Sequence, residues 1–292
     1  MAKSQARKPD LRPTNSETPL RKTPDSPRDF DDLLAQFAPR RWLHDPRATG
    51  AGIRVAVIDS GIERAVLEDR FAGRGHSIAR IEGAVFRAGS PAPLPYDGHQ
   101  SSPHGTTVAD IILGLAPQAT LFSADVFGPQ GSCEVETVIA GLRHAMDVWN
   151  VKVINLSLGV PEHKLQLLPK RNQLLRAIEE AYYRDVLVFA AAHNDHPVTK
   201  SYPAAFGPPL ISVDKALFDD PLQFAYALRD QVEFQAHSRG YFGPFSREPA
   251  TSWATPHLTG IAARLLSLRP GMKPFEIKAI LYWMGQAMGG AE

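Results

Sequence analysis

From Gly50 onward, short apolar runs alternate along the chain with amphipathic segments. The runs are rich in β-branched residues and are bounded by polar or turn-forming residues, which is typical of buried strands. Nearly continuous apolar strands separated by helices predict an α/β fold with a mostly parallel sheet that is covered on both faces. The predicted strands are residues 53–58, 120–126, 151–156, 186–191 and 210–213.

Between these runs, apolar residues recur three and four positions apart, which is the spacing of one face of a helix. Three such stripes predict helices that pack on the sheet. The stripes are Val108, Ile111, Ile112 and Leu115; Val135, Val138, Ile139, Leu142 and Trp149; and Leu174, Leu175, Ile178 and Tyr182.

A fourth stripe, from Leu258 to Leu266, predicts a helix near the C-terminus. Pro256 is tolerated best in a first helical turn, so we expect this helix to begin near Ser252. A serine in that place is either a helix cap or a hydroxyl nucleophile beside backbone N–H groups that could receive an oxyanion. The rest of the chain has to decide between the two.

The termini differ in composition from the centre. Residues 1–28 are rich in Pro, Lys, Arg, Ser and Thr and are predicted to be a disordered tail, and residues 286–292 a short C-terminal tail. Residues 29–49 form an N-terminal arm with a predicted helix that packs on the body or serves as a lid or inhibitory segment. The main domain is predicted over residues 50–285, with 82–103 as a surface excursion.

Charge and composition exclude several classes of partner. The 292 residues contain 32 Lys and Arg against 31 Asp and Glu, so no broad basic surface for nucleic acid or a membrane is predicted. The single cysteine, Cys133, rules out an internal disulfide. The start of the chain has no apolar signal region, and no run is long enough to span a bilayer. We therefore expect a cytoplasmic protein.

Polar residues follow several of the predicted strands. Asp59 follows the first strand, residues 155–159 end a central one, and residues 193–195 end the next. The carboxyl ends of parallel strands share one edge of a sheet, where ligands bind. We expect these groups to converge there with Ser252 and with His104, which starts its own helix.

Serine-dependent acyl transfer needs a hydroxyl, an imidazole, a carboxylate and an oxyanion donor. Ser252, His104, Asp59 and Asn194 can fill these four roles. Each also has an ordinary structural interpretation, as a cap, a helix-start residue, a turn aspartate or a loop asparagine.

Three segments, residues 57–61, 104–109 and 251–257, resemble the three catalytic boxes of the subtilisin-like serine proteases (subtilases, peptidase family S8). The likeness extends from about Gly52 to Trp283. The resemblance implies a three-layer subtilisin-like fold, a catalytic triad of Asp59, His104 and Ser252, and Asn194 as the oxyanion donor.

The resemblance also implies that a peptide substrate adds as an extended strand between two backbone edges. The edges would be residues 156–159 and 128–132, although the glycines of the second edge also fit a flexible turn. The predicted substrate-binding residues are Leu156, Ser157, Leu158, Gly159, Gly128, Gly131, Ser132, Ala191, Ala192, His193 and Ser201.

Departures from the family pattern refine these expectations. His193 precedes Asn194, and Ser201 precedes Tyr202, where glycine is usual, so we predict a narrowed or more polar primary pocket and restricted specificity. Ala250 also replaces a glycine, which leaves either regular or strained backbone before Thr251.

No metal or other cofactor is predicted. Asp110 is interpreted as a solvated charge on its helix rather than as a calcium contact, and no run of oxygen ligands resembles a calcium loop, so calcium is unsupported and left open. His193 and His196 lack further zinc ligands. Cys133 is interpreted as an inert residue near the cleft.

The sequence thus predicts a serine endopeptidase that acts on peptides or proteins through an acyl-enzyme. Two alternatives stay open at this point: a peptide cyclase or transpeptidase with the same triad, and a catalytically impaired peptide-binding scaffold. The segment before Gly50 is shorter than the folded prodomain of the family's secreted members. We therefore expect restraint from narrow specificity, from the N-terminal arm or from a regulatory partner protein.

Overall fold

A computed structural model of the chain describes residues 39–128, 131–165, 167–242 and 248–289. The predictions for the tail at 1–28 and for most of the arm helix lie outside these residues. The described elements are α2 (Pro39–Leu43), β1 (Arg54–Asp59), α3 (Arg64–Ala72), β2 (Glu82–Val85), β3 (Leu94–Pro95), α4 (Pro103–Leu115), β4 (Thr120–Asp125), α5 (Val135–Asp147), β5 (Val153–Leu156), β6 (Val160–Pro161), η1 (Glu162–Lys164), α6 (Leu168–Tyr183), β7 (Leu187–Ala191), β8 (Ser201–Tyr202), η2 (Ala204–Phe206), β9 (Ile211–Ala216), β10 (Phe224–Arg229), β11 (Val232–His237), α7 (Thr251–Leu268) and α8 (Pro274–Gly289).

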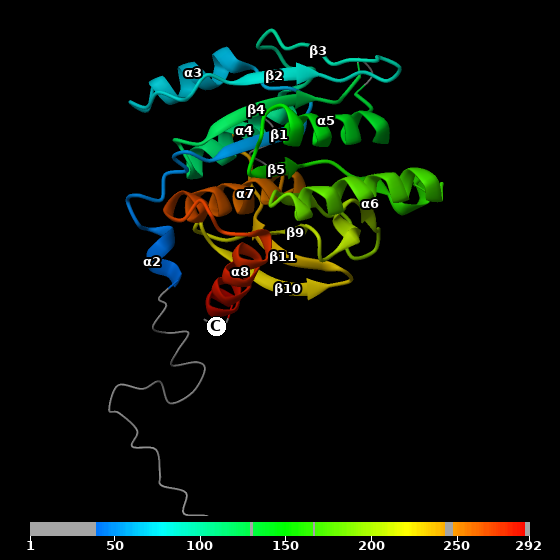
Figure 1. The fold of residues 1–292 in the computed structure, drawn as a ribbon. Helices are drawn as coiled ribbons and strands as arrows, with labels where there is room; N and C mark the ends of the chain where they lie inside the picture. The colour runs from blue at the N-terminus through cyan, green and yellow to red at the C-terminus, as the bar shows by residue number, and fades with distance from the viewer. Residues whose placement is uncertain (1–38, 129–130, 166, 243–247, 290–292) are drawn as a thin grey trace, which may run out of the picture. The chain divides into compact units, whose positions relative to one another are not determined.

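A twisted sheet runs through the centre of the described structure (Figure 1). Its strand order is β10-β11-β9-β7-β5-β1-β4-β2-β3, and every neighbouring pair from β11 to β2 is parallel. The antiparallel pairs β10–β11 and β2–β3 stand at the two margins. The predicted, mostly parallel sheet is confirmed.

Alternate residues of the central strands face two separate cores. In β1, Val55 and Val57 belong to the core beneath α4 and α7, whereas Ala56 and Ile58 belong to the core beneath α5 and α6. The alternation follows from the period of two in a strand. Because both faces are buried, the strands read as continuous apolar runs, and the predicted three-layer arrangement is confirmed.

The ends of the sheet depart from the sequence prediction. Residues 82–103 were expected to be a surface excursion, but Glu82–Val85 is strand β2, which pairs in parallel with β4. Ala84 and Phe86 are buried there. The hairpin of β10 and β11 was not predicted either. Strands at or near the edge of a sheet bury fewer residues, so their apolar pattern is weaker than that of central strands.

Helix α7 crosses α4 closely, and Gly260 makes this contact possible. A Cβ atom at residue 260 would lie 2.9 Å from Cβ of Leu115. The apolar stripe predicted from Leu258 to Leu266 is buried, as expected. Pro256, however, lies inside α7 and not in its first turn, because the helix already begins at Thr251.

The prediction for Asp110 is wrong. Its side chain is 1% exposed and accepts a hydrogen bond from Arg70 Nε at 2.6 Å, so it is a buried ion pair between α4 and α3. Burial raises the pKa of Asp110 despite the charge of Arg70. The sequence could not show this, because Arg70 approaches Asp110 only in the folded chain.

The two flanks of the predicted main domain are continuous with it. Leu43 and Ala48, from the predicted arm, are buried, and Arg264 of α7 donates to the carbonyl of Leu43. At the other end α8 continues to Gly289, past the boundary predicted at residue 285. No helix in the described part of the chain is long and apolar enough to cross a membrane.

Candidate active site

Asp59 is the last residue of β1, and its carboxylate is almost completely buried. A buried carboxylate needs hydrogen-bond donors, because it has lost its hydration. The backbone N–H of Ser60 donates to Asp59 Oδ1 at 2.7 Å, and His104 Nδ1 lies 2.8 Å from the same oxygen. The orientation of the Asp59 carboxylate is therefore fixed by Ser60 on one side and by His104 on the other.

His104 stands in the first turn of α4, after the cap residue Ser102 and Pro103. Its Nδ1 lies 2.8 and 3.0 Å from the two oxygens of Asp59, which makes Nδ1 the protonated nitrogen and leaves Nε2 as the basic one. Gly105 is required beside it, since a Cβ at that position would lie 2.1 Å from the carbonyl oxygen of Gly61. Only glycine lets α4 approach β1 closely enough for this contact.

The surroundings of His104 act on its pKa in opposite directions. Burial alone would lower the pKa, but the negative charge of Asp59 and the hydrogen bond to it outweigh burial and raise the pKa above the ordinary 6.5. Asp59 therefore stabilises the protonated form of the imidazole.

Ser252 is the second residue of α7 and is partly exposed. The ring of the next residue, Trp253, lies against the imidazole of His104, with 4.8 Å between ring centroids. Asp59, His104 and the residue adjoining Ser252 are thus in continuous contact. The structure thus brings Asp59 and His104 together and places the imidazole beside the start of α7.

Asn194 lies on the loop after β7 and docks on the start of α7. Its Oδ1 accepts from the backbone N–H of Thr251 at 3.0 Å and from the Thr251 hydroxyl at 3.2 Å. Because an amide is planar, Nδ2 lies on the opposite arm and presents its N–H groups away from Thr251. The backbone N–H of Ser252 lies in the first turn of α7, where N–H groups have no partner within the helix.

The backbone before the nucleophile is regular. Ala250 has φ −140° and ψ 151°, which is extended conformation that any residue adopts. The replacement of glycine therefore stores no strain. It also leaves the docking of Asn194 on Thr251 intact, so this departure from the family pattern does not disturb the site.

The two predicted substrate edges differ in character. Leu156 and Leu158 are buried, and Gly159 is exposed at the end of the first edge. In the second, the N–H of Gly128 donates to the carbonyl of Ser132 at 2.8 Å, and Gly131 has φ +70°. These residues form a turn that is bonded within itself, which favours the alternative interpretation of the glycines.

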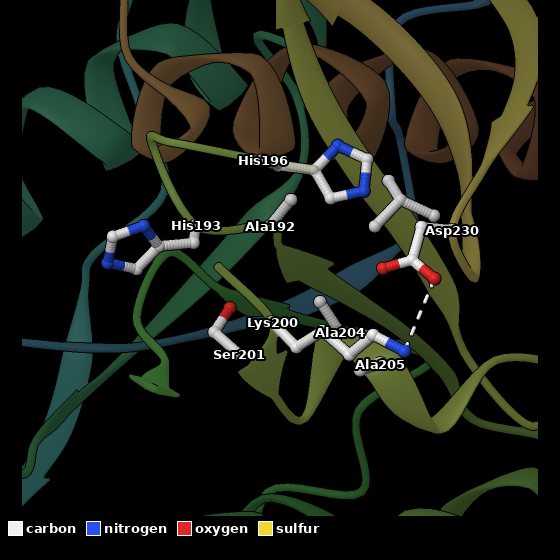
Figure 2. A pocket seen from close by; sticks show the side chains of 9 residues that line it. Ala192, His193, His196, Lys200, Ser201, Ala204, Ala205 and Asp230 are labelled. Atoms are coloured by element: carbon white, nitrogen blue, oxygen red, sulfur yellow. Dashed lines mark ion pairs between the residues drawn. The ribbon is translucent and has the colours of Figure 1, made fainter. Parts of the chain in front are cut away.

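A pocket next to the oxyanion segment contains two of the departures from the family pattern (Figure 2). His193 and Ala192 lie on one side of it and Ser201 faces them, while Lys200 and Asp230 form an ion pair of 3.2 Å. Ser201 Oγ lies 3.2 Å from the position that a Cβ of Gly159 would take. The Ser201 side chain therefore occupies space beside the first substrate edge. Ala191 is buried at the end of β7.

Other reactive groups near the site have structural roles. Burial raises the pKa of the Cys133 thiol to about 11, with a smaller contribution from Asp59, so the thiolate is absent at neutral pH. His196 pairs with Asp214 at 3.1 Å. Within the described residues no three His, Cys, Asp or Glu side chains are grouped as metal ligands.

The sequence analysis did not predict the side-chain contacts that hold these residues, although it placed Ser157 in a substrate edge. Trp253, the hydroxyl of Ser157 and the side chains of Asn155 and Thr259 all contact the start of α7 or each other. One signal was present: a proline inside a helix leaves a carbonyl without its usual donor.

Comparison with known proteins identifies the family of the chain. The subtilase family model matches residues 50–217 and 227–287. M-protease of Shouchella clausii (strain KSM-K16) is 30% identical over 246 residues, which cover 80% of this chain and 59% of that protein. Subtilisin E of Bacillus subtilis (strain 168) is 31% identical over 248 residues, which cover 78% of this chain and 59% of that protein. The chain therefore spans less than two thirds of the length of both relatives.

The solved structure of S41 Psychrophilic Protease shares the fold with a TM-score of 0.64, at 24% identity, over 80% of this chain and 82% of that one. The fold is that of a three-layer α/β protein, with Asp59 at the carboxyl end of β1 and His104 paired with it. The chain belongs to the subtilase family.

The raised pKa of His104 predicts the pH dependence of any reaction that needs its neutral form. The value of kcat/KM will rise with pH, and the midpoint of that rise will lie above pH 6.5.

The Asp59→Asn variant loses the charge that raises the pKa of His104. The midpoint of the pH profile will therefore move to lower pH, and kcat will fall by about 10⁴. Initial rates from pH 5 to 10 measure both; a midpoint that does not move in the variant contradicts the assignment.

The geometry of Asn194 predicts the effect of removing its amide. Asn194→Ala will lower kcat by about 10²–10³, which is the loss found in subtilisin when one oxyanion donor is removed. KM will change little, because the donor acts on charge that develops after binding. Steady-state kinetics test this, with Asp195→Ala as the control on the same loop. Equal kcat values for the two variants would remove Asn194 from the role.

Proposed function

We propose that this protein is a serine endopeptidase that cleaves peptide bonds through an acyl-enzyme. The contact that carries the proposal is the 2.8 Å approach of His104 Nδ1 to the buried Asp59, with the same imidazole packed on the residue after Ser252. A carboxylate that orients an imidazole beside the residue that carries the hydroxyl is what serine-dependent acyl transfer uses. Membership of the subtilase family supports it.

In this proposal Ser252 Oγ attacks the carbonyl carbon of the scissile bond while its proton passes to His104 Nε2. The resulting oxyanion receives hydrogen bonds from Asn194 Nδ2 and from the N–H of Ser252. His104 then gives the proton to the leaving amine as the carbon–nitrogen bond breaks. Water, deprotonated by the same imidazole, attacks the ester and regenerates the Ser252 hydroxyl. Asp59 holds the tautomer and stabilises the imidazolium.

Labelling with a fluorophosphonate probe tests this assignment. The probe phosphonylates a serine only when a base activates its hydroxyl, so the full chain will be labelled at Ser252 and Ser252→Ala will not be labelled. Mass spectrometry of the labelled peptide identifies the site. Ser60→Ala is not a suitable control because Ser60 supports Asp59; Ser212→Ala, in β9, serves instead. Absence of label on the folded wild-type chain would sink the proposal.

We further propose that the enzyme has restricted specificity, because its primary pocket is narrow. Ser201 is 4% exposed and fills space next to Gly159, and His193 projects from the segment that precedes Asn194. Both positions are glycine in the usual family pattern. The side chain that precedes the cleaved bond would lie between these segments, so small residues are favoured there.

Peptide p-nitroanilides that differ only at this residue will test the pocket. The wild-type kcat/KM will be higher with alanine than with phenylalanine, because excess side-chain volume is excluded. Ser201→Gly combined with His193→Gly will raise the phenylalanine-to-alanine ratio by about 10-fold or more, the effect of one or two carbon atoms in such a pocket. Lys200→Ala, on the same pocket but paired with Asp230, is the control. A ratio unchanged in the double variant would refute a narrow pocket.

The finer predictions on partners and location remain predictions. A regulatory partner protein would restrain the protease, and a cytoplasmic location would be consistent with a single, partly buried cysteine. Neither enters the catalytic proposal.

A further inference from the structure

The proline in α7 removes one hydrogen bond at the nucleophile. In an α-helix, the carbonyl of each residue accepts from the N–H four residues later. The carbonyl of Ser252 would accept from residue 256, but this is Pro256, which has no N–H. A carbonyl in this place, next to a buried helix turn, needs another donor.

The hydroxyl of Ser157 supplies that donor. Its Oγ donates to the carbonyl oxygen of Ser252 at 2.9 Å, and Ser157 is 4% exposed. The donor comes from the segment after β5, on a different part of the chain. Ser157 thus takes the place of the missing helical N–H at the residue that carries the nucleophilic oxygen.

The hydroxyl of Ser157 is itself oriented. Asn155 Nδ2 donates to Ser157 Oγ at 2.9 Å, so that the hydroxyl hydrogen of Ser157 is directed to Ser252. The other arm of the Asn155 amide, Oδ1, accepts from the hydroxyl of Thr259 at 2.9 Å. Thr259 lies in α7, so the chain of hydrogen bonds begins and ends on the same helix.

A second bond runs in the opposite direction. Ser252 Oγ donates to the carbonyl oxygen of Ser157 at 3.3 Å. The backbone and the side chain of Ser252 are therefore both held by one residue. The bond from the nucleophile is the longer of the two, and it is the one that has to break when the hydroxyl turns towards a substrate.

We propose that Ser157 is a positioning residue for the nucleophile: its hydroxyl replaces the N–H that Pro256 cannot provide, and it thereby fixes the direction of Ser252 Oγ. This inference rests on the proposed role of Ser252. It assigns the side chain of Ser157 a task separate from the substrate contacts expected of its backbone. A small displacement of a reacting atom is costly for the rate, because reaction requires a near-attack geometry.

A double-mutant cycle tests the proposal directly. Ser157→Ala will lower kcat and the rate constant of fluorophosphonate labelling about 10-fold, which corresponds to a loss of about 1.36 kcal/mol of transition-state stabilisation. KM will change little. In the Pro256→Ala background residue 256 regains an N–H that can donate to Ser252, so Ser157→Ala will have a much smaller effect there. Ser157→Thr keeps the hydroxyl and will retain most of the wild-type rate.

Controls separate positioning from loss of structure. Ser212→Ala removes another buried hydroxyl with two hydrogen bonds, to the backbone of Gln231 and Glu233, and will alter stability without altering the labelling rate. If Ser157→Ala does not fold, Ser157→Cys replaces it; the thiol is a weaker donor, and its rate will lie below that of the wild type.

The outcomes are distinguishable. Equal losses from Ser157→Ala in the two backgrounds, or an undiminished rate in Ser157→Ala or Ser157→Cys, would overturn the positioning role. Persistent labelling of Ser252→Ala would instead overturn the proposed nucleophile and leave the hydrogen bonds of Ser157 without a catalytic meaning.

Discussion

The buried carboxylate of Asp59 is the constraint on which the site depends. A charge in this position is tolerated only with donors on every side that water has left. The N–H of Ser60 and the imidazole of His104 are those donors, at 2.7 and 2.8 Å. Their presence requires α4 to approach the end of β1 closely, and Gly105 is the residue that permits it. The need of the Asp59 carboxylate for hydrogen-bond donors therefore accounts for the position of α4, for the glycine at residue 105 and for the tautomer of His104.

The contact between α4 and α7 places His104 beside the start of α7, where Ser252 lies. Both helices lie on the same face of the sheet, and Gly260 lets them cross at short distance. The His104 ring consequently rests on Trp253, the residue after Ser252. A site assembled in this way draws its accuracy from packed helices and strands, which deform less than loops. The loop that bears Asn194 is held to the same helix through Thr251.

The substitutions that distinguish this chain from the usual family pattern have different consequences because their environments differ. Ala250 sits in extended backbone and changes nothing in the geometry. Asp110 is accommodated in the interior because Arg70 accompanies it. His193 and Ser201 instead line a pocket beside the segment of Asn194, where the proposed function places the substrate side chain. The structural effect of each replacement thus depends on what surrounds the side chain.

The sequence alone determined the layers of the fold, because buried strands need continuous apolar runs. It selected Asp59, His104, Ser252 and Asn194 as candidates for one site, because the three motifs occur in order. It missed β2, β10 and β11, which lie at or near the edges of the sheet and have a weak apolar pattern. It also predicted a solvated Asp110, whose side chain is buried. Only the tertiary structure decided that Ser157 serves the carbonyl left bare by Pro256. The reason is physical: local patterns report what a residue does to its own helix or strand, whereas a hydrogen bond between distant segments exists only once packing has brought them together.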